Sequence, residues 1–380
     1  MPRELIAIAP RTPELREYEE PALGQNEIRI RSELASPKHG TELVAYRDEP
    51  VASRPYDPAW GAVMARNAEG GPNRFPTPLG NMAVGVVVAV GPDVSRFQPG
   101  DRVFGHFPIR ETHTVDEHLA DRLPDGLSAE AALCLDPVVM ALAIRDAGIA
   151  LGDRVAVFGL GAIGLIAVQL ARLSGAETVI AVDPLPNRRA LARDFGADIV
   201  LDPSANDGDT GLDIRRTTGF RSAGDHQRVE RRLVGGYLDR PTQLHQLGVD
   251  VAVETSGSIA ALQQAIRATR FGGTVAVISF YGQDASGLRL GEEFHINQLK
   301  LVSVRAQSQP LRGAPGWTLE RLVSLGLKWM IDSRIKTEGI IDPIVPFEEC
   351  AQAYRMIDEH PERSIKLGVQ FSRTCENVKP

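Results

Sequence analysis

A short apolar run that enters a glycine-rich turn constrains the fold of this chain more than any other stretch. It reads Val155-Ala-Val-Phe-Gly-Leu-Gly-Ala-Ile-Gly-Leu165, and a helical pattern continues from Ile166 to Leu173. Gly159 permits a tight turn at the end of a strand, and Gly164 lets a helix pack close to that strand. The sequence therefore predicts strand, turn and helix, the first unit of a parallel α/β sheet.

The spacing of the glycines and of one acidic residue predicts a dinucleotide site at this turn. Gly161 lets backbone N–H groups approach a pyrophosphate, and the start of the helix directs further N–H groups at it. A second apolar run ends in Asp183, about 20 residues beyond the last glycine, where a carboxylate accepts from the ribose 2′-OH of NAD and repels the 2′-phosphate of NADP. We therefore expect NAD as the cofactor. The residues expected at the phosphates are Gly159, Gly161, Ala162, Ile163 and Gly164.

Length and charge limit the classes of protein to which the chain can belong. It has 380 residues, enough for two domains, and a formal net charge of −7, which argues against nucleic acid as a partner. No apolar run reaches the roughly 18 residues of a membrane span, and the N-terminus has no signal-peptide pattern, so we expect a cytoplasmic protein. Cys134, Cys350 and Cys375 are widely spaced and are expected to be buried or incidental thiols.

The order of the predicted elements changes along the chain. The first third is rich in strands, such as Leu5 to Ala9, Glu27 to Arg31 and the apolar Gly80 to Gly91. From Ser128 helical patterns begin, and strands then alternate with helices, which predicts a parallel sheet with crossover helices. The stretch from about 204 to 247 fits this pattern poorly. We interpret it as a solvated polar insertion, with a lid or a subunit contact as the alternative.

These segments together resemble the medium-chain dehydrogenase/reductase superfamily, the alcohol dehydrogenase-like proteins, over nearly the whole chain. The motifs that carry the resemblance occur in order: Gly85-x-Val-x-x-Val-Gly91, Pro99-Gly-Asp-Arg-Val103, the glycine turn, Glu254-x-Ser-Gly257 and Gly272-Gly273. The resemblance implies a Rossmann doubly wound parallel sheet, at 137–308, inserted in a GroES-like, partly open β-barrel catalytic domain built from 1–136 and 309–380. It also implies an active site in the cleft, and we expect a homodimer or homotetramer without nucleic-acid or membrane partners.

The positions that hold the catalytic zinc in this family have unusual residues here. The first falls on His39 before Gly-Thr-Glu42, the second on Asn81 and the third on Asp136 before Pro137. Zinc prefers thiolate, imidazole and carboxylate ligands, and this set lacks the thiolate and has an amide in one position. The four-cysteine lobe of the structural zinc is also absent from the sequence. We therefore expect no metal at the site.

Without zinc, the hydroxyl proton of an alcohol substrate needs another acceptor. Thr41 matches the hydroxyl relay of the family, and we expect His39 to act as general base or relay, oriented by Asp136, because an imidazole titrates near neutral pH. The alternative is a packed loop histidine beside lost ligands. Asn81 completes the expected catalytic set.

The resemblance also assigns residues beyond the glycine turn to the cofactor. They are Arg188 beside the adenosine ribose, Thr255, Ser256 and Ser279 at later strand ends, and Lys366 toward the pyrophosphate. The alternative for Lys366 is a lysine on a solvated strand edge.

The resulting hypothesis is an NAD-dependent, zinc-free oxidoreductase that interconverts a secondary alcohol and a ketone on a small, polyhydroxylated or bulky metabolite. The zinc-lacking branches of the family with a similar Ser36 to Glu42 pattern include bacteriochlorophyllide dehydrogenase. Two alternatives stay open. One is a quinone or enoyl reductase using NAD(P)H, and the other is a non-catalytic dinucleotide-binding protein.

Overall fold

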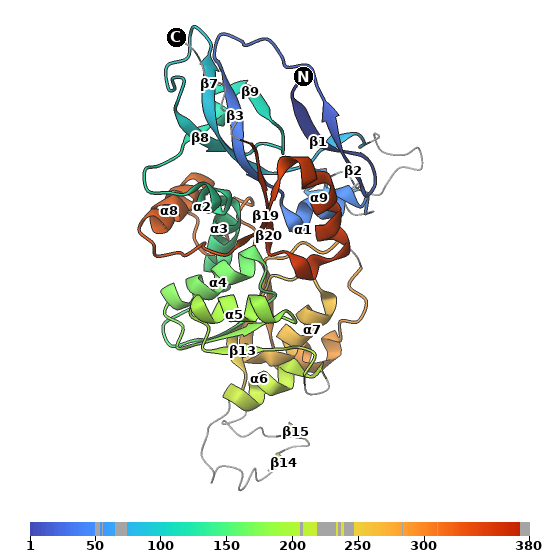
Figure 1. The fold of residues 1–380 in the computed structure, drawn as a ribbon. Coiled ribbons are helices and arrows are strands. Elements are labelled where there is room, and N and C mark those ends of the chain that lie inside the picture. The colour runs from blue at the N-terminus through green and yellow to red at the C-terminus, as the bar shows by residue number, and fades with distance from the viewer. Residues whose placement is uncertain are drawn as a thin grey trace. The chain divides into compact units, whose positions relative to one another are not determined.

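The chain divides into two units, of which the first combines both ends of the sequence and the second is one continuous stretch (Figure 1). The computed structural model describes residues 1–49, 54, 56–64, 74–205, 208–218, 233–234, 237–238, 247–282, 284–309 and 311–372. The first unit comprises Met1–Asp136 and Thr337–Pro380, and the second comprises Pro137–Lys336. Within the described residues, no helix is long and apolar enough to cross a membrane.

The second unit is built on a six-stranded parallel sheet, as predicted. Its strand order is β13-β12-β11-β16-β17-β18, so the order reverses at β11, the strand that enters the glycine turn. A sheet wound in both directions from its middle opens a crevice at the carboxyl ends of the strands beside the reversal. The strands are β11 (Arg154–Phe158), β12 (Thr178–Val182), β13 (Ile199–Leu201), β16 (Val249–Glu254), β17 (Thr269–Val277) and β18 (Lys300–Ser303).

Crossover helices join these strands and cover the sheet. Helices α4 and α5 pack beside one another against β11, β12 and β13, whereas α6 and α7 pack beside one another and contact β16. Right-handed crossovers in opposite directions place the two pairs on opposite faces. The helical elements are α3 (Leu135–Leu142), η3 (Ala143–Ala147), α4 (Ala162–Leu173), α5 (Pro186–Asp194), α6 (Thr210–Thr218), α7 (Ile259–Ala268), η6 (Leu290–Phe294) and α8 (Leu319–Ile331).

The first unit holds two sheets, and the larger one combines both parts of its chain. One has the order β2-β1-β6, and the other has the order β10-β8-β7-β3-β20-β19, with β9 also paired to β3. The C-terminal β20 pairs antiparallel with β3, which joins the end of the chain to its beginning. The strands are β1 (Arg3–Ala9), β2 (Thr12–Glu17), β3 (Glu27–Ser36), β6 (Thr77–Pro78), β7 (Met82–Val90), β8 (Arg102–Gly105), β9 (Thr112–Asp116), β10 (Asp121–Arg122), β19 (Ile341–Pro346) and β20 (Lys366–Gln370).

Short helices and hairpins complete the described residues. Helix α1 forms where no helical pattern was predicted, because its apolar side chains Leu43 and Tyr46 are buried in the core of the first unit. The helical elements of the first unit are α1 (His39–Tyr46), η2 (Glu117–Leu119), α2 (Ala129–Leu133), η7 (Phe347–Glu349), α9 (Cys350–Glu359) and η8 (Pro361–Arg363). The hairpins pair β4 (Tyr56–Asp57) with β5 (Ala62–Val63) and β14 (Leu233–Val234) with β15 (Tyr237–Leu238).

One predicted domain boundary differs from the structure, and one predicted insertion lies mostly outside the described residues. We placed the return to the first domain at 309, but the chain up to Lys336 belongs to the second unit. It is held there because the Asp146 carboxylate accepts from Arg312 N and Gly313 N, and Gln169 binds the backbone of Lys336. Most of the predicted insertion, including 219–232 and 239–246, lies outside the described residues.

Two of the three cysteines behave as expected. Cys134 and Cys350 are free and buried, and burial raises the pKa of each thiol to about 12. Cys375 lies outside the described residues.

A buried histidine is expected to make the first unit sensitive to acid. His113 on β9 is 3% exposed and stacks on Phe107, and burial with the nearby Arg110 charge lowers its pKa from 6.5 to about 3. Between these values the unfolded chain binds the extra proton, so stability is complete above pH 6.5 and is lost as the pH falls toward 3. We expect the free energy of unfolding to fall by up to about 1.4 kcal/mol per pH unit in this window.

The variant His113→Phe tests this origin of the acid sensitivity. It keeps an aromatic ring against Phe107, and Ser32 Oγ keeps its hydrogen bond to Arg110 O at 2.6 Å. Urea unfolding followed by circular dichroism at several pH values should show a shallower acid slope for the variant. An unchanged slope would assign the acid sensitivity to other groups.

Candidate functional site

The glycine turn after β11 has the geometry that its sequence predicts. Gly159 has a φ of +86°, and a Cβ at this position would lie 2.6 Å from Ser256 Cβ. A Cβ at Gly164 would overlap the carbonyl oxygen of Gly159, whereas a Cβ at Gly161, the N-cap of α4, meets no atom within 4 Å. The first and third glycines are therefore required by packing, and the second leaves open space at the helix N-terminus, where an anion binds favourably.

The later strand ends converge on the same turn. Thr255 Oγ1 donates to Gly159 O at 2.6 Å, Ser256 N donates to Glu254 Oε1 at 2.7 Å, and the Ser279 hydroxyl accepts from Gly257 N at 2.9 Å. The sequence analysis did not identify Glu254 as a residue of the site. Its carboxylate is fully buried and also accepts from the hydroxyls of Ser256 and Tyr281. The sequence feature that could have identified Glu254 is its place as an acidic residue at the end of an apolar strand.

Asp183 lies where the ribose is expected, at the end of β12. Its carboxylate is 3% exposed and accepts from Leu160 N at 2.7 Å and from Leu185 N at 2.9 Å. Two arginines gather beside it: Arg188 Nη1 is 3.7 Å from Asp183 Oδ2, and Arg189 Nη1 donates to Asp183 O at 2.6 Å. The carboxylate is thus fixed by two backbone donors, and a carboxylate has acceptor capacity for further hydroxyl groups.

In the first unit, the segment from Ser36 to Glu42, which runs from the end of β3 into the first turn of α1, is held by two distant parts of the chain. Asn81 N donates to Ser36 O at 3.0 Å, and Lys366 Nζ donates to Pro37 O at 2.6 Å. Leu367 N donates to His39 Nε2 at 3.0 Å. Because Nε2 accepts this hydrogen bond, the His39 ring is neutral with its proton on Nδ1.

Lys366 is buried rather than solvated. It is 4% exposed, and burial lowers the pKa of its ammonium group below the ordinary 10.5. The alternative of a solvated strand-edge lysine is therefore wrong. Its expected contact with a pyrophosphate stays a prediction.

The carboxylate of Asp136 pairs with a residue that the sequence analysis did not consider. Asp136 is 7% exposed, and Lys38 Nζ lies 2.9 Å from its Oδ1. The expected role of Asp136 in orienting His39 stays a prediction. The observed partner of the carboxylate, the Lys38 ammonium group, is a charged donor, and such donors bind carboxylates strongly.

Glu42 is the third residue that the sequence analysis missed, after Glu254 and Lys38. Its buried carboxylate accepts from Gly80 N at 2.7 Å, from Lys38 N at 2.9 Å and from Tyr354 OH at 2.7 Å. Burial raises the pKa of Glu42 above 4.5, and burial beside Glu42 raises the pKa of Tyr354 well above 10. The sequence signal was weak, because Glu42 stands four residues after the N-cap Lys38, one beyond the position at which a capping Glu is usually found.

The other two predicted residues of this unit lie near these groups in the chain and differ in exposure. Thr41 is exposed on α1. Asn81 is partly buried, and its Nδ2 is a buried donor without a hydrogen-bond partner among the described residues. A buried unpaired donor is costly, and a bound ligand that offers an acceptor is one way to satisfy it.

The residues at the three family zinc positions do not fit a zinc ion. The lone pair of His39 Nε2 is directed at a backbone N–H, Asn81 offers an amide, and the Asp136 carboxylate is paired with an ammonium group. Within the described residues, His, Cys, Asp and Glu form no group of three that could hold a metal. We therefore derive no step through a metal.

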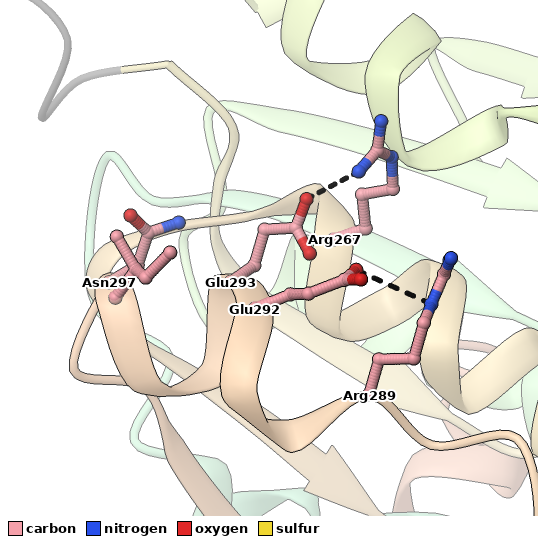
Figure 2. Close-up of a pocket in the computed structure, with 6 residues that line it drawn as sticks. Arg267, Arg289, Glu292, Glu293 and Asn297 are labelled. Atoms are coloured by element: carbon pink, nitrogen blue, oxygen red, sulfur yellow. Dashed lines mark hydrogen bonds and ion pairs between the residues drawn. The ribbon is translucent and has the colours of Figure 1, made fainter.

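A polar hollow elsewhere in the second unit is not part of this site. It has a volume of about 570 Å³ and is lined by residues of α7, η6 and the following turn, as Figure 2 shows. Arg267 pairs with Glu293 at 2.5 Å and with Asp209 at 2.7 Å, and Arg289 pairs with Glu292 at 3.3 Å. The arginines that line the hollow are therefore paired with carboxylates, and their charges are neutralised.

A doubly wound sheet with a glycine turn at its reversal defines a dinucleotide-binding protein of Rossmann type. Two family models match: "Zinc-binding dehydrogenase" over residues 162–314 and "Alcohol dehydrogenase GroES-like domain" over residues 59–134. The chain is 37% identical to D-guloside 3-dehydrogenase of Escherichia coli over 97% of this chain and 100% of that protein. It belongs to the medium-chain dehydrogenase/reductase, alcohol dehydrogenase-like superfamily.

Solved structures have the same fold at low sequence identity. The 2R,3R-butanediol dehydrogenase of Bacillus subtilis matches with a TM-score of 0.68 and 22% identity, over 97% of this chain and 99% of that one. A putative zinc-binding dehydrogenase of Sinorhizobium meliloti, bound to NADP, matches with a TM-score of 0.67 and 21% identity over the same shares. The predicted family, fold class and enzyme class are confirmed.

Proposed function

We propose that this protein is an NAD-dependent dehydrogenase that interconverts a secondary alcohol and a ketone on a polyhydroxylated small molecule, of the polyol or glycoside class, without zinc. The observation that carries this proposal is the full-length similarity to D-guloside 3-dehydrogenase. The unpaired Asn81 Nδ2 supports a substrate rich in hydroxyl groups, because each hydroxyl oxygen offers acceptor sites.

The zinc-free part of the proposal is supported by the donor set. A zinc ion would compete with the Lys38 ammonium for Asp136 and with the Leu367 N–H for His39 Nε2. It would also need to accept an amide as its third ligand.

The cofactor turn and the segment from Ser36 to Glu42 would each supply different groups for the reaction. When bound, the nicotinamide supplies the acceptor or donor of a hydride, and the turn at Gly161 holds the phosphates. The substrate oxygen must lose a proton as the hydride leaves its carbon. His39 and Thr41 remain our candidates from the sequence, and His39 Nε2 accepts a proton only after its hydrogen bond from Leu367 N is broken.

The proposed function is tested with the purified full chain and a panel of substrates. The panel contains polyols, methyl glycosides, simple secondary alcohols, quinones and enones, each with NAD(H) and NADP(H), and the readout is reduced-cofactor absorbance. We expect turnover of a polyol or glycoside with NAD, unchanged after chelation of metals. Turnover of quinones or enones alone would favour the reductase alternative, and cofactor binding without any turnover would favour a non-catalytic protein.

The choice of NAD over NADP is tested by Asp183→Asn. The amide keeps an oxygen for Leu160 N and removes the negative charge that would repel a 2′-phosphate, beside Arg188 and Arg189. We expect the ratio of kcat/KM for NAD over that for NADP to fall at least about ten-fold, which corresponds to about 1.4 kcal/mol. A parent enzyme that already prefers NADP would contradict the assignment.

A further inference from the structure

One charged group of the first unit has no role in the proposal above. Lys38 stands at the N-cap of α1, directly before His39, and its side chain is 22% exposed. Its ammonium group is 2.9 Å from the Asp136 carboxylate, which is itself almost fully buried. The ammonium group is therefore held in one place, on a side chain that is partly exposed.

We propose that Lys38 is a catalytic residue of this enzyme, whose ammonium group donates a hydrogen bond to the reacting oxygen of the alcohol or ketone, with Asp136 as the residue that positions it. This inference rests on the proposed function. It places a protein cation beside the aspartate at one of the positions that hold zinc in related enzymes.

The position of Lys38 is fixed at both ends of the residue. Its backbone N–H is bound by Glu42 Oε2 at 2.9 Å, and its Nζ is bound by Asp136 Oδ1. Glu42 Oε1 binds Gly80 N at 2.7 Å, so one carboxylate holds both Lys38 and the residue before Asn81. The Lys38 backbone and the chain at Asn81, with its unpaired Nδ2, are therefore close to one another.

Neighbouring groups are less suited to contact the oxygen. His39 Nε2 is occupied by Leu367 N, and the Lys366 ammonium group is buried against Pro37 O. Lys38 has three N–H donors, of which Asp136 Oδ1 takes one, so donors remain for a substrate. A preorganised cation is most effective where negative charge develops, and hydride transfer creates alkoxide character at this oxygen in either direction.

Water finally accepts the proton that the alcohol loses in this step. In oxidation, the C–H bond breaks with its electron pair passing to the nicotinamide, and the O–H bond breaks as the carbonyl forms. The hydroxyl proton passes to Lys38 Nζ as that nitrogen gives one of its protons to water, so the lysine ends in its starting charge state. The reduction runs through the same bonds in reverse.

The experiment compares Lys38→Met, Lys38→Arg and Lys38→Ala with the parent full-length protein, using the best substrate of the panel. Lys328→Met is the matched control, because Lys328 also pairs with an aspartate, Asp332, at 2.8 Å but on the exposed side of α8. For Lys38→Met we expect kcat/KM to fall at least about 100-fold, as is typical when one donor to a developing oxyanion is lost. NADH affinity, measured by fluorescence, should be unchanged, and Lys328→Met should retain parental kcat/KM.

Two further measurements separate catalysis from folding. Methylammonium added to Lys38→Ala should restore part of kcat, which a merely structural lysine would not do. The double variant K38M/D136L removes the charged pair together, so that no uncompensated carboxylate is buried, and should stay folded but equally inactive.

The outcomes are distinct. A parent protein without turnover overturns the proposed function and this inference with it. An active parent whose Lys38→Met variant keeps kcat/KM within about three-fold overturns only the inference, since such a loss is below 1 kcal/mol. Loss of activity without rescue by methylammonium, together with a lowered unfolding midpoint in K38M/D136L, also overturns it.

Discussion

Gly164→Ala is expected to destabilise the second unit and to weaken cofactor binding together. The new Cβ would overlap the Gly159 carbonyl oxygen and would lie 2.7 Å from Thr255 Oγ1. The carbonyl cannot move freely, since Thr255 Oγ1 donates to it at 2.6 Å. Overpacking of this kind costs about 1–3 kcal/mol, and against backbone we expect the upper end or more. Urea unfolding and NADH fluorescence titration measure the two effects, and we expect at least a roughly ten-fold weaker affinity.

Gly161→Ala is the matched control for this prediction. Gly161 has a φ of −69°, which alanine adopts, and its Cβ would meet no atom within 4 Å. Stability should therefore stay within about 0.5 kcal/mol of the parent. Affinity for NADH should still fall, because the methyl group fills the space through which the pyrophosphate approaches. Parental affinity in Gly161→Ala would show that the phosphates bind elsewhere, and parental stability in Gly164→Ala would show that the turn adjusts.

Glu42→Ala is expected to destabilise the first unit by about 3 kcal/mol, because it leaves three buried or partly buried donors without their acceptor. These donors are the N–H groups of the partly buried Lys38 and Gly80 and the hydroxyl of the fully buried Tyr354. Activity should fall as well, since the same carboxylate positions Lys38. Urea unfolding at near-neutral pH and kcat/KM measure the two effects.

Tyr354→Phe is the milder comparison, because it removes one donor and leaves Glu42 its two backbone partners. We expect it to cost about 1 kcal/mol, the usual net value of one hydrogen bond. Equal losses in the two variants would contradict the central role of the carboxylate.

The pH dependence of Glu42 has the opposite sign to that of His113. Its folded pKa is raised above 4.5 by burial, so the folded state binds a proton that the unfolded chain releases. This contribution favours folding as the pH falls from the raised folded pKa toward 4.5, and it is lost as the pH rises through that folded pKa. Glu42→Gln should remove this component from the profile of unfolding free energy against pH.

The second unit could be predicted largely from the sequence because its determinants are local. A glycine turn, an apolar strand before it and an acid after the next strand are read in one window, and the structure has β11, α4 and β12 there. Alternation of strands and helices then fixes a parallel sheet through short connections. Helix α6 was missed, because it begins inside the stretch that we interpreted as a polar insertion.

The first unit was predicted less completely because its elements depend on partners far along the chain. Strand β2 lies in a polar stretch that contains Pro13, and it forms by pairing with β1. Helix α1 is short and has no strong pattern, and its first turn is stabilised by Glu42 and by the burial of its apolar face.

The sequence by itself determined the family, the dinucleotide turn and the three altered zinc positions, since each is a pattern of neighbouring residues. Only the tertiary structure decided what those positions contact. Lys38 meets Asp136 across 98 residues, and His39 meets Leu367 across 328. The physical reason is that the pairing of β20 with β3 and the packing of α1 bring together groups whose distance along the chain carries no information about their distance in space.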